Sequence, residues 1–132
     1  MPKKVKIVSI LAVSFCLLFF IFRSFSEPKD IYSAETLYNF YASNEIEANK
    51  KFKDKKIEIE GTVKNISKLN NKLTFFLKTN HKSSTILCEL KDAEIQEASQ
   101  IQINDFITIS GTCKGFLKDV IVLECKLIKH KK

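Results

Sequence analysis

Tryptophan is absent from this 132-residue chain, which has only three glycines, two prolines and two histidines. So few glycines leave no glycine-rich phosphate loop, and no nucleophile elbow or Ser-x-x-Lys pattern occurs. The cysteines include no Cys-x-x-Cys pair, and neither His81 nor His130 stands near a cysteine, so no zinc site is predicted. Glu58 and Glu60 share one face of a predicted strand, and exposure of that face to solvent is enough to explain the two carboxylates. The sequence therefore predicts a non-enzymatic protein without metal or cofactor.

The net charge of +7 is concentrated at the N-terminus. Residues 1–26 hold three lysines, one arginine and no acidic residue, which leaves 18 basic and 15 acidic side chains, a balance of +3, in the rest. The remaining lysines gather at residues 50–56 and 126–132, and a solvated surface is the simplest interpretation of such runs. Much of the basic character therefore belongs to a targeting segment rather than to the folded domain.

The N-terminal segment has the layout of a signal sequence, with lysines before the apolar run of residues 7–22. The sixteen residues of this run would span about 24 Å as a helix, which is less than a hydrocarbon core of about 30 Å. A helix over residues 5–25 would be long enough to cross it. Two fates remain open: an uncleaved signal-anchor, which we favour, and cleavage near Ser26. Lysines before the run predict that the N-terminus lies inside and that the domain is extracytoplasmic. The domain would be membrane-bound if the segment is kept, and secreted or periplasmic if it is cleaved.

After residues 1–26, a polar linker is predicted at residues 27–32 and one folded domain at residues 33–130. The first element is an amphipathic helix over residues 34–51, and Asp92 is predicted to cap a short second helix. The stripe of the first helix contains Leu37, Tyr41, Asn44, Ala48 and Phe52, widened by Tyr38, Ala42 and Ile46. The predicted strands are residues 57–64, 73–78, 85–90, 106–114 and 120–128, and the second helix covers residues 93–100.

This order of elements predicts the fold class. Five strands with a helix between the third and fourth are typical of the OB fold, a small Greek-key barrel. Gly61 and Gly111 occupy the same place in two similar strands, where a glycine lets a strand bend around a barrel. The predicted fold is mainly β: an OB-fold-like five-stranded Greek-key barrel preceded by an amphipathic helix.

The chain after the linker also resembles a known family. The similarity rests on the Ile59-Glu60-Gly61-Thr62-Val63 stretch, on Cys88, and on Gly111-Thr112-Cys113-Lys114-Gly115. It also includes Ser33-Ala34-Glu35, Asn44-Glu45, Phe52-Lys53-Asp54-Lys55 and Leu123-Glu124-Cys125. These residues resemble the tRNA-anticodon-like OB-fold family of exported or membrane-anchored bacterial proteins of unknown function. The resemblance implies the fold and names no ligand.

Strand alternation predicts a candidate ligand face. If Leu73, Phe75 and Leu77 point inward, the outer face carries Thr74, Phe76, Lys78 and Leu87. Phe76 and Leu87 suit an unknown protein, peptide or saccharide ligand, so the sequence predicts a membrane-tethered binding module. A single-stranded nucleic-acid-binding protein is the alternative. It ranks lower because one aromatic and one lysine, near several glutamates, make a weak platform for phosphates and bases.

The last three cysteines are predicted to point inward, in phase with Ile86, Ile109 and Leu123. Cys113 and Cys125 lie equally far from Asp119, so they would face each other across the final hairpin. Export to an oxidising compartment then favours a Cys113–Cys125 disulfide, with Cys88 as an odd thiol. The alternative is three small buried hydrophobic side chains.

Overall fold

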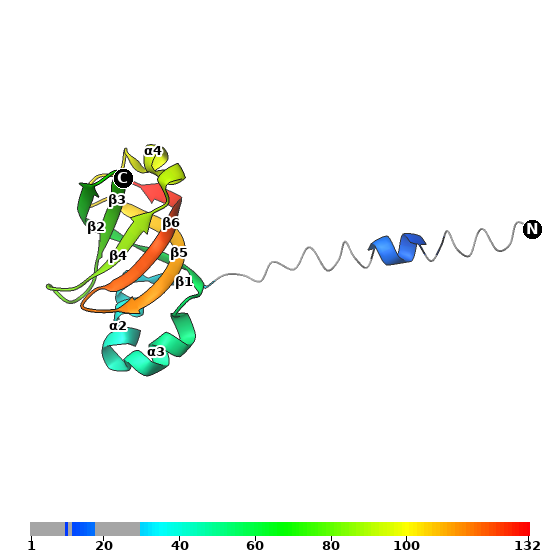
Figure 1. Cartoon of the computed structure of the whole chain (residues 1–132), viewed down its shortest axis with the longest axis horizontal. Helices are drawn as coiled ribbons and strands as arrows, with labels where there is room; N and C mark the ends of the chain where they lie inside the picture. Colours follow the sequence, from blue (N-terminus) through cyan, green and yellow to red (C-terminus); the bar gives the residue numbers. More distant parts are fainter. Residues whose placement is uncertain (1–9, 11, 18–29) are drawn as a thin grey trace, which may run out of the picture.

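The computed structural model describes residue 10, residues 12–17 and residues 30–132. Within the last range, a short strand and two helices precede a barrel, and a small helical element comes before its last two strands (Figure 1). In chain order the elements are β1 (Ile31–Ser33), α2 (Ala34–Ser43), α3 (Glu45–Phe52), β2 (Lys56–Leu69), β3 (Lys72–Lys78), β4 (Thr85–Leu90), the 3-10 helix η1 (Asp92–Glu94), α4 (Ile95–Ala98), β5 (Phe106–Phe116) and β6 (Val120–Lys131).

One sheet contains all six strands in the order β1-β2-β3-β4-β6-β5, and a further pairing of β2 with β5 closes it. Strand β2 closes the barrel because its first half, residues 56–62, pairs with β5 and its second half, residues 63–69, pairs with β3. Strand β1, which begins inside the linker expected from the sequence, adds a parallel neighbour to β2. The predicted five-stranded OB-fold barrel is confirmed.

The two similar strand segments pair with each other. Residues 57–62 and 107–112 share the pattern Ile-x-Ile-x-Gly-Thr and run antiparallel, with Ile59 opposite Ile109 at the centre. Each glycine therefore lies opposite the first isoleucine of the other segment, Gly61 opposite Ile107 and Gly111 opposite Ile57. The repeated pattern thus forms a locally symmetric seam between β2 and β5.

Both glycines also allow another element to approach closely. A Cβ atom on Gly61 would lie 3.0 Å from the Cβ of Ala34, where α2 crosses the barrel. A Cβ on Gly111 would lie 2.7 Å from Cys125 Sγ and 2.9 Å from the carbonyl oxygen of Leu123 in β6. Real Cβ atoms essentially never come that close, so β6 fits against β5 only because residue 111 has no side chain.

The single helix predicted over residues 34–51 is wrong at its centre, because Asn44 divides it. The backbone of Asn44 is extended, with φ −159°, and its Oδ1 accepts a hydrogen bond from the Glu47 amide at 3.2 Å, so Asn44 is the N-cap of α3. The break turns Ile46 outward, where it is 71% exposed instead of lying on the core stripe. Ala42 is exposed as well, whereas Leu37, Tyr38, Tyr41, Ala48 and Phe52 are buried.

Asp92 does not cap a helix as predicted. No side-chain capping bond forms at the start of η1 or α4, and Asp92 Oδ1 instead accepts from Lys72 Nζ at 3.1 Å. The predicted helix over residues 93–100 is a 3-10 turn followed by one α-helical turn, with Ile95 half-buried and Ala98 buried. Asp92 thus links this element to the β2–β3 hairpin.

The last strand continues three residues beyond the predicted end at Ile128. Its final residues pair with the start of β5, where Phe106 faces Lys131 and Thr108 faces Lys129. His130, expected in a basic tail, lies with its Nε2 at 2.6 Å from Asp105 Oδ2. The backbone N–H of Gln102, followed by His130, lowers the pKa of Asp105. This cluster fastens the C-terminal strand to the turn before β5.

Candidate functional site

The residues predicted to bind a ligand lie together on the outer surface of β3 and β4. Leu73, Phe75 and Leu77 are buried in the barrel, which directs Thr74, Phe76 and Lys78 outward. Phe76 lies directly opposite Leu87, and both side chains are half-buried. The strand alternation read from the sequence therefore places these side chains correctly.

The structure extends this surface on both sides into a row across four strands. Asn65 of β2 lies opposite Phe76, and Ile121 of β6 lies opposite Leu87. Ile121 is half-buried and points outward, because Val120 and Val122 on either side of it are fully buried. We call Thr74, Phe76, Lys78, Leu87 and Ile121 the ligand face.

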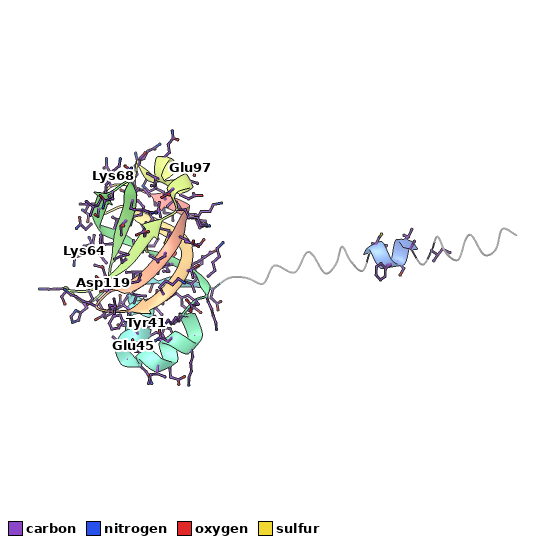
Figure 2. The ribbon with its side chains drawn as sticks, in the orientation of Figure 1. Tyr41, Glu45, Lys64, Lys68, Glu97 and Asp119 are labelled. Atoms are coloured by element: carbon purple, nitrogen blue, oxygen red, sulfur yellow. The ribbon has the colours of Figure 1, made fainter. Side chains whose placement is uncertain are left out.

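A basic pocket adjoins the Lys78 end of the ligand face. Its volume is about 390 Å³, and it is lined by Lys64, Lys78, Thr79, Asn80, His81 and Lys82. Lys64 Nζ donates to the Lys82 carbonyl oxygen at 2.6 Å, and Lys78 Nζ donates to Asn104 Oδ1 at 2.7 Å. Both acceptors are neutral, so the positive charges stay uncompensated by carboxylates at these contacts. Figure 2 shows Lys64 on the flank of the barrel, between Lys68 near α4 and Asp119 near the other end.

Hydrogen bonds hold the loop that supplies His81 and Lys82. Thr79 Oγ1 donates to the Ser84 carbonyl oxygen at 2.8 Å and accepts from the His81 amide at 3.1 Å. At the end of the loop, Asp119 Oδ1 accepts from the amide of Thr85 at 2.7 Å and from its hydroxyl at 3.1 Å. The pocket is thus built on a braced loop, which lowers the entropic cost of binding there.

Sequence reasoning missed the basic pocket and Ile121 for different reasons. The alternation of apolar and polar residues in β2 continues through Lys64 and marks it as exposed, but no local pattern shows that Lys64 lies beside Lys78 and Lys82. In β6, the irregularity marked by the positive φ of 53° at Glu124 reverses the alternation, so Ile121 was assigned to the wrong side of the strand. The excess of lysine at positions 64, 78 and 82 was the only signal in the sequence for a basic pocket.

The cysteine pairing geometry expected from the sequence is wrong. Cys113 lies opposite Val122, and the irregularity at Glu124 shifts the register so that Cys125 lies beside Leu90 of β4. Leu123, expected to point inward, is half-buried, while Cys125 is fully buried. Cys88, Cys113 and Cys125 are free thiols in this structure. The two cysteines are thus not opposite each other, as the predicted Cys113–Cys125 disulfide assumed.

The buried thiols have other partners in the core. Cys113 Sγ lies 3.2 Å from the Tyr41 hydroxyl, and Cys125 Sγ donates to the Val122 carbonyl oxygen at 3.4 Å. Burial, followed by the contact with Cys113, raises the pKa of Tyr41. A hydrogen bond to Cys125, followed by burial, raises the pKa of the Cys88 thiol. Tyr41 and Cys88 are thus kept neutral in the core, outside the ligand face.

The fold and its family are now defined. The model of the tRNA_anti-like family matches residues 4–127 of the chain. The chain belongs to the tRNA_anti-like family. The resemblance found in the sequence is thereby confirmed. A search of the curated proteins gives no match.

Solved structures are similar to this tRNA_anti-like domain at low sequence identity. A putative nucleic acid-binding lipoprotein from Klebsiella pneumoniae has 14% identity and a TM-score of 0.62, over 76% of this chain and 92% of that one. A putative aspartyl-tRNA synthetase from Leishmania major has 10% identity and a TM-score of 0.54, over 83% of this chain but only 22% of the synthetase. Similarity at this level establishes the OB fold.

The predicted membrane segment, residues 5–25, lies mostly outside the described residues. Of this segment, the structure describes residue 10 and residues 12–17, which are helical. Among all described residues, no helix is both long and apolar enough to cross a membrane.

Proposed function

We propose that this tRNA_anti-like protein is a non-catalytic binding module that takes an extended anionic ligand on its ligand face. Residues 5–25 would hold it at the extracytoplasmic side of a membrane. The observation that carries the proposal is the row of Phe76, Leu87 and Ile121 across three strands, ending at the basic pocket. An extended ligand could pack against this row and place negative charge at Lys64 and Lys78.

Two features support binding rather than catalysis. Of the three side chains with raised pKa values, Tyr41 and Cys88 are enclosed in the core, and Lys72 is exposed and pairs with Asp92 outside the basic pocket. Among the residues that the structure describes, no three His, Cys, Asp or Glu side chains come together as metal ligands would. The ligand face instead offers an apolar surface with a braced basic pocket, which suits recognition of a chain-like partner.

Binding can be tested with the full chain in phosphatidylcholine nanodiscs. Fluorescently labelled poly-glutamate, an anionic polysaccharide and single-stranded oligothymidine are the probes, read by anisotropy. We expect Phe76→Ala to weaken binding of the recognised probe by about tenfold, as truncation of a central aromatic contact does. Replacing Lys64 and Lys78 by glutamine should weaken binding further and flatten its dependence on salt.

Matched controls separate the ligand face from general effects. Phe106→Ala removes an aromatic side chain that is 38% exposed at the start of β5. Lys126→Gln with Lys129→Gln removes two exposed charges from β6. Both controls should bind as the unmodified protein does. Equal losses in Phe76→Ala and Phe106→Ala would contradict the proposed face.

Single-stranded nucleic acid is the second candidate ligand, because Phe76 lies on the same strand face as Lys78 and beside the basic pocket. OB barrels bind single strands with stacked aromatic side chains and a positive groove. The structure thus provides more positive charge near Phe76 than the one lysine counted from the sequence. Preference for oligothymidine over poly-glutamate, with a steep loss of affinity in salt, would favour this candidate.

The location is tested by protease treatment of intact spheroplasts, read with an antibody against the C-terminal half. Digestion without lysis is expected if the domain is extracytoplasmic. Protection until lysis would place the domain in the cytosol, and the charge-based topology would then be wrong.

A further inference from the structure

A second surface, separate from the ligand face, lies where α3 ends and β2 begins. Residues 50–56 contain five lysines and one aspartate. Lys50 pairs with Glu47 at 3.0 Å, and Asp54 pairs with Lys114 at 3.0 Å. The other four lysines form no ion pair with any residue that the structure describes; they are Lys51, Lys53, Lys55 and Lys56. We call these four the α3 lysine cluster.

Exposed apolar side chains lie close to this cluster. Lys51 Nζ is 4.5 Å from the centre of the Phe40 ring, and Phe40 is 39% exposed. On α3, Ile46 is two residues before the buried Ala48 and six before the buried Phe52, so it points away from the barrel. The break at Asn44 thus produces an outer helix surface on which Ile46 is exposed between Glu45 and Glu47, and Glu47 is paired with Lys50 one turn before the α3 lysine cluster.

The domain begins beside this same surface. Strand β1 runs parallel to β2 with Ile31 opposite Glu58, and the Tyr32 ring packs edge-on against Phe52 at 5.1 Å. Figure 1 shows α3 at the end of the folded domain opposite α4, with β1 at the edge of the barrel on the α3 side. Ile31, the first residue of β1, is itself 48% exposed. The chain therefore enters the domain next to the α3 lysine cluster.

The sequence before β1 limits how far this end can move from a bilayer. The apolar run ends at residue 22, nine residues before Ile31. Nine residues reach at most about 30 Å when fully extended. As a flexible chain they separate their ends by about 17 Å on average. If the apolar run lies in a membrane, the α3 lysine cluster is held close to the headgroups.

We propose that the α3 end docks on the surface of an anionic lipid bilayer. The proposal rests on the tether included in the proposed function. Lysines without acidic partners complement anionic headgroups, and each contributes about 1 kcal/mol when it is close to the surface, a factor of about five in affinity. Ile46, Phe40 and Ile31 supply apolar contacts at the headgroup level. Docking fixes the domain with the β3–β4 surface free to meet its ligand.

Tryptophan fluorescence tests the docking, because the chain has no tryptophan of its own. The full chain with Ile46→Trp is reconstituted in vesicles of acyl-brominated phosphatidylcholine, with or without phosphatidylglycerol. We expect a blue shift and quenching only in the anionic vesicles. Leu69→Trp is the matched control, since Leu69 is 68% exposed and lies at the β2–β3 turn. It should show neither change.

Charge variants test the role of the lysines. In the Ile46→Trp background, Lys53→Glu with Lys56→Glu should reduce quenching by more than half, and added salt should do the same. The matched control is Lys68→Glu with Lys91→Glu, which makes the same change in net charge at two exposed sites outside the α3 end. The control should leave quenching unchanged.

The outcomes separate docking from tethering. Flotation with pure phosphatidylcholine vesicles reports the tether alone. Equal quenching of Ile46→Trp and Leu69→Trp, or insensitivity to the lysine reversals, would overturn docking even when flotation succeeds. Loss of flotation in neutral vesicles would overturn the tether, and the docking proposal that rests on it would then fail too.

Discussion

The ligand face and the α3 end both combine exposed apolar side chains with lysines, yet they hold these lysines differently. Beside the ligand face, Lys64 and Lys78 each donate to a defined neutral oxygen, at 2.6 and 2.7 Å. At the α3 end, Lys55 Nζ donates to the Lys50 carbonyl oxygen at 3.2 Å and Lys51 lies over the Phe40 ring, but Lys53 and Lys56 make no side-chain hydrogen bond with any described residue. Charges held by a defined partner suit a ligand of definite geometry, whereas charges without one suit a surface without definite geometry, such as a bilayer.

The apolar parts of the two regions also differ. Phe76, Leu87 and Ile121 form a row on a rigid barrel, where the register sets their spacing. Phe40 and Ile46 lie on two short helices joined at Asn44, and the aromatic ring of Phe52 anchors them to the core. The ligand face thus depends on the barrel, and the α3 end depends on aromatic packing and on one helix cap.

The largest predicted difference concerns the two phenylalanines. Phe52 is 1% exposed and contacts the rings of Tyr32, Phe40 and Tyr41, so Phe52→Ala should lower the free energy of unfolding by about 3–5 kcal/mol. Phe76 is half-buried, and Phe76→Ala should cost about 1 kcal/mol. Urea unfolding of both variants measures the difference. Equal losses would mean that Phe76 belongs to the core.

The two glycines at which elements of the barrel approach closely come next. Gly111→Ala should lower the free energy of unfolding by about 3 kcal/mol, because its Cβ would strike Cys125 Sγ and a backbone oxygen of β6. Gly61→Ala should cost about 1 kcal/mol, because its nearest contact is the single Ala34 Cβ at 3.0 Å. Thermal unfolding of the two variants compares them. A larger loss in Gly61→Ala would reverse the assignment of the tighter contact.

A helix cap gives a smaller and more local effect. Asn44→Ala removes the cap of α3 and should cost about 1 kcal/mol of stability. It should also weaken docking on anionic vesicles while ligand binding stays unchanged. Ser33→Ala, which removes the cap of α2, is the matched control for stability and should leave docking intact. A loss of ligand binding in Asn44→Ala would show that the two regions are coupled.

The smallest effect at neutral pH concerns the buried neutral groups. Because folding raises the pKa of Cys88 and Tyr41, the folded state retains protons that the unfolded chain loses at alkaline pH. Stability from this source is complete below the ordinary thiol pKa of about 8.5 and is lost as pH rises toward the raised values. Urea unfolding between neutral pH and about pH 10.5 should show this decline. Stability that rises over this range would contradict it.

Alternation of apolar and polar residues was sufficient to predict the central part of every barrel strand and the outward side chains of the regular strand β3, but it ended β2 at residue 64, five residues before Leu69. It failed wherever the backbone departed from regularity. The irregularity at Glu124 placed Leu123 outside and Cys125 inside. Helical spacing likewise continued through Asn44, because that residue fits both an i+4 series and an N-cap.

The sequence by itself determined the class of fold, because short-range patterns encode which residues can be buried in a strand or a helix. It also determined the charge asymmetry of the N-terminus and the absence of familiar catalytic motifs. The tertiary structure decided what the barrel places side by side: the seam of the two Ile-x-Ile-x-Gly segments, the thiol contacts, and the pocket that joins Lys64 to Lys78 and Lys82. Long-range register sets these contacts, and register depends on bulges and close approaches that no local pattern records.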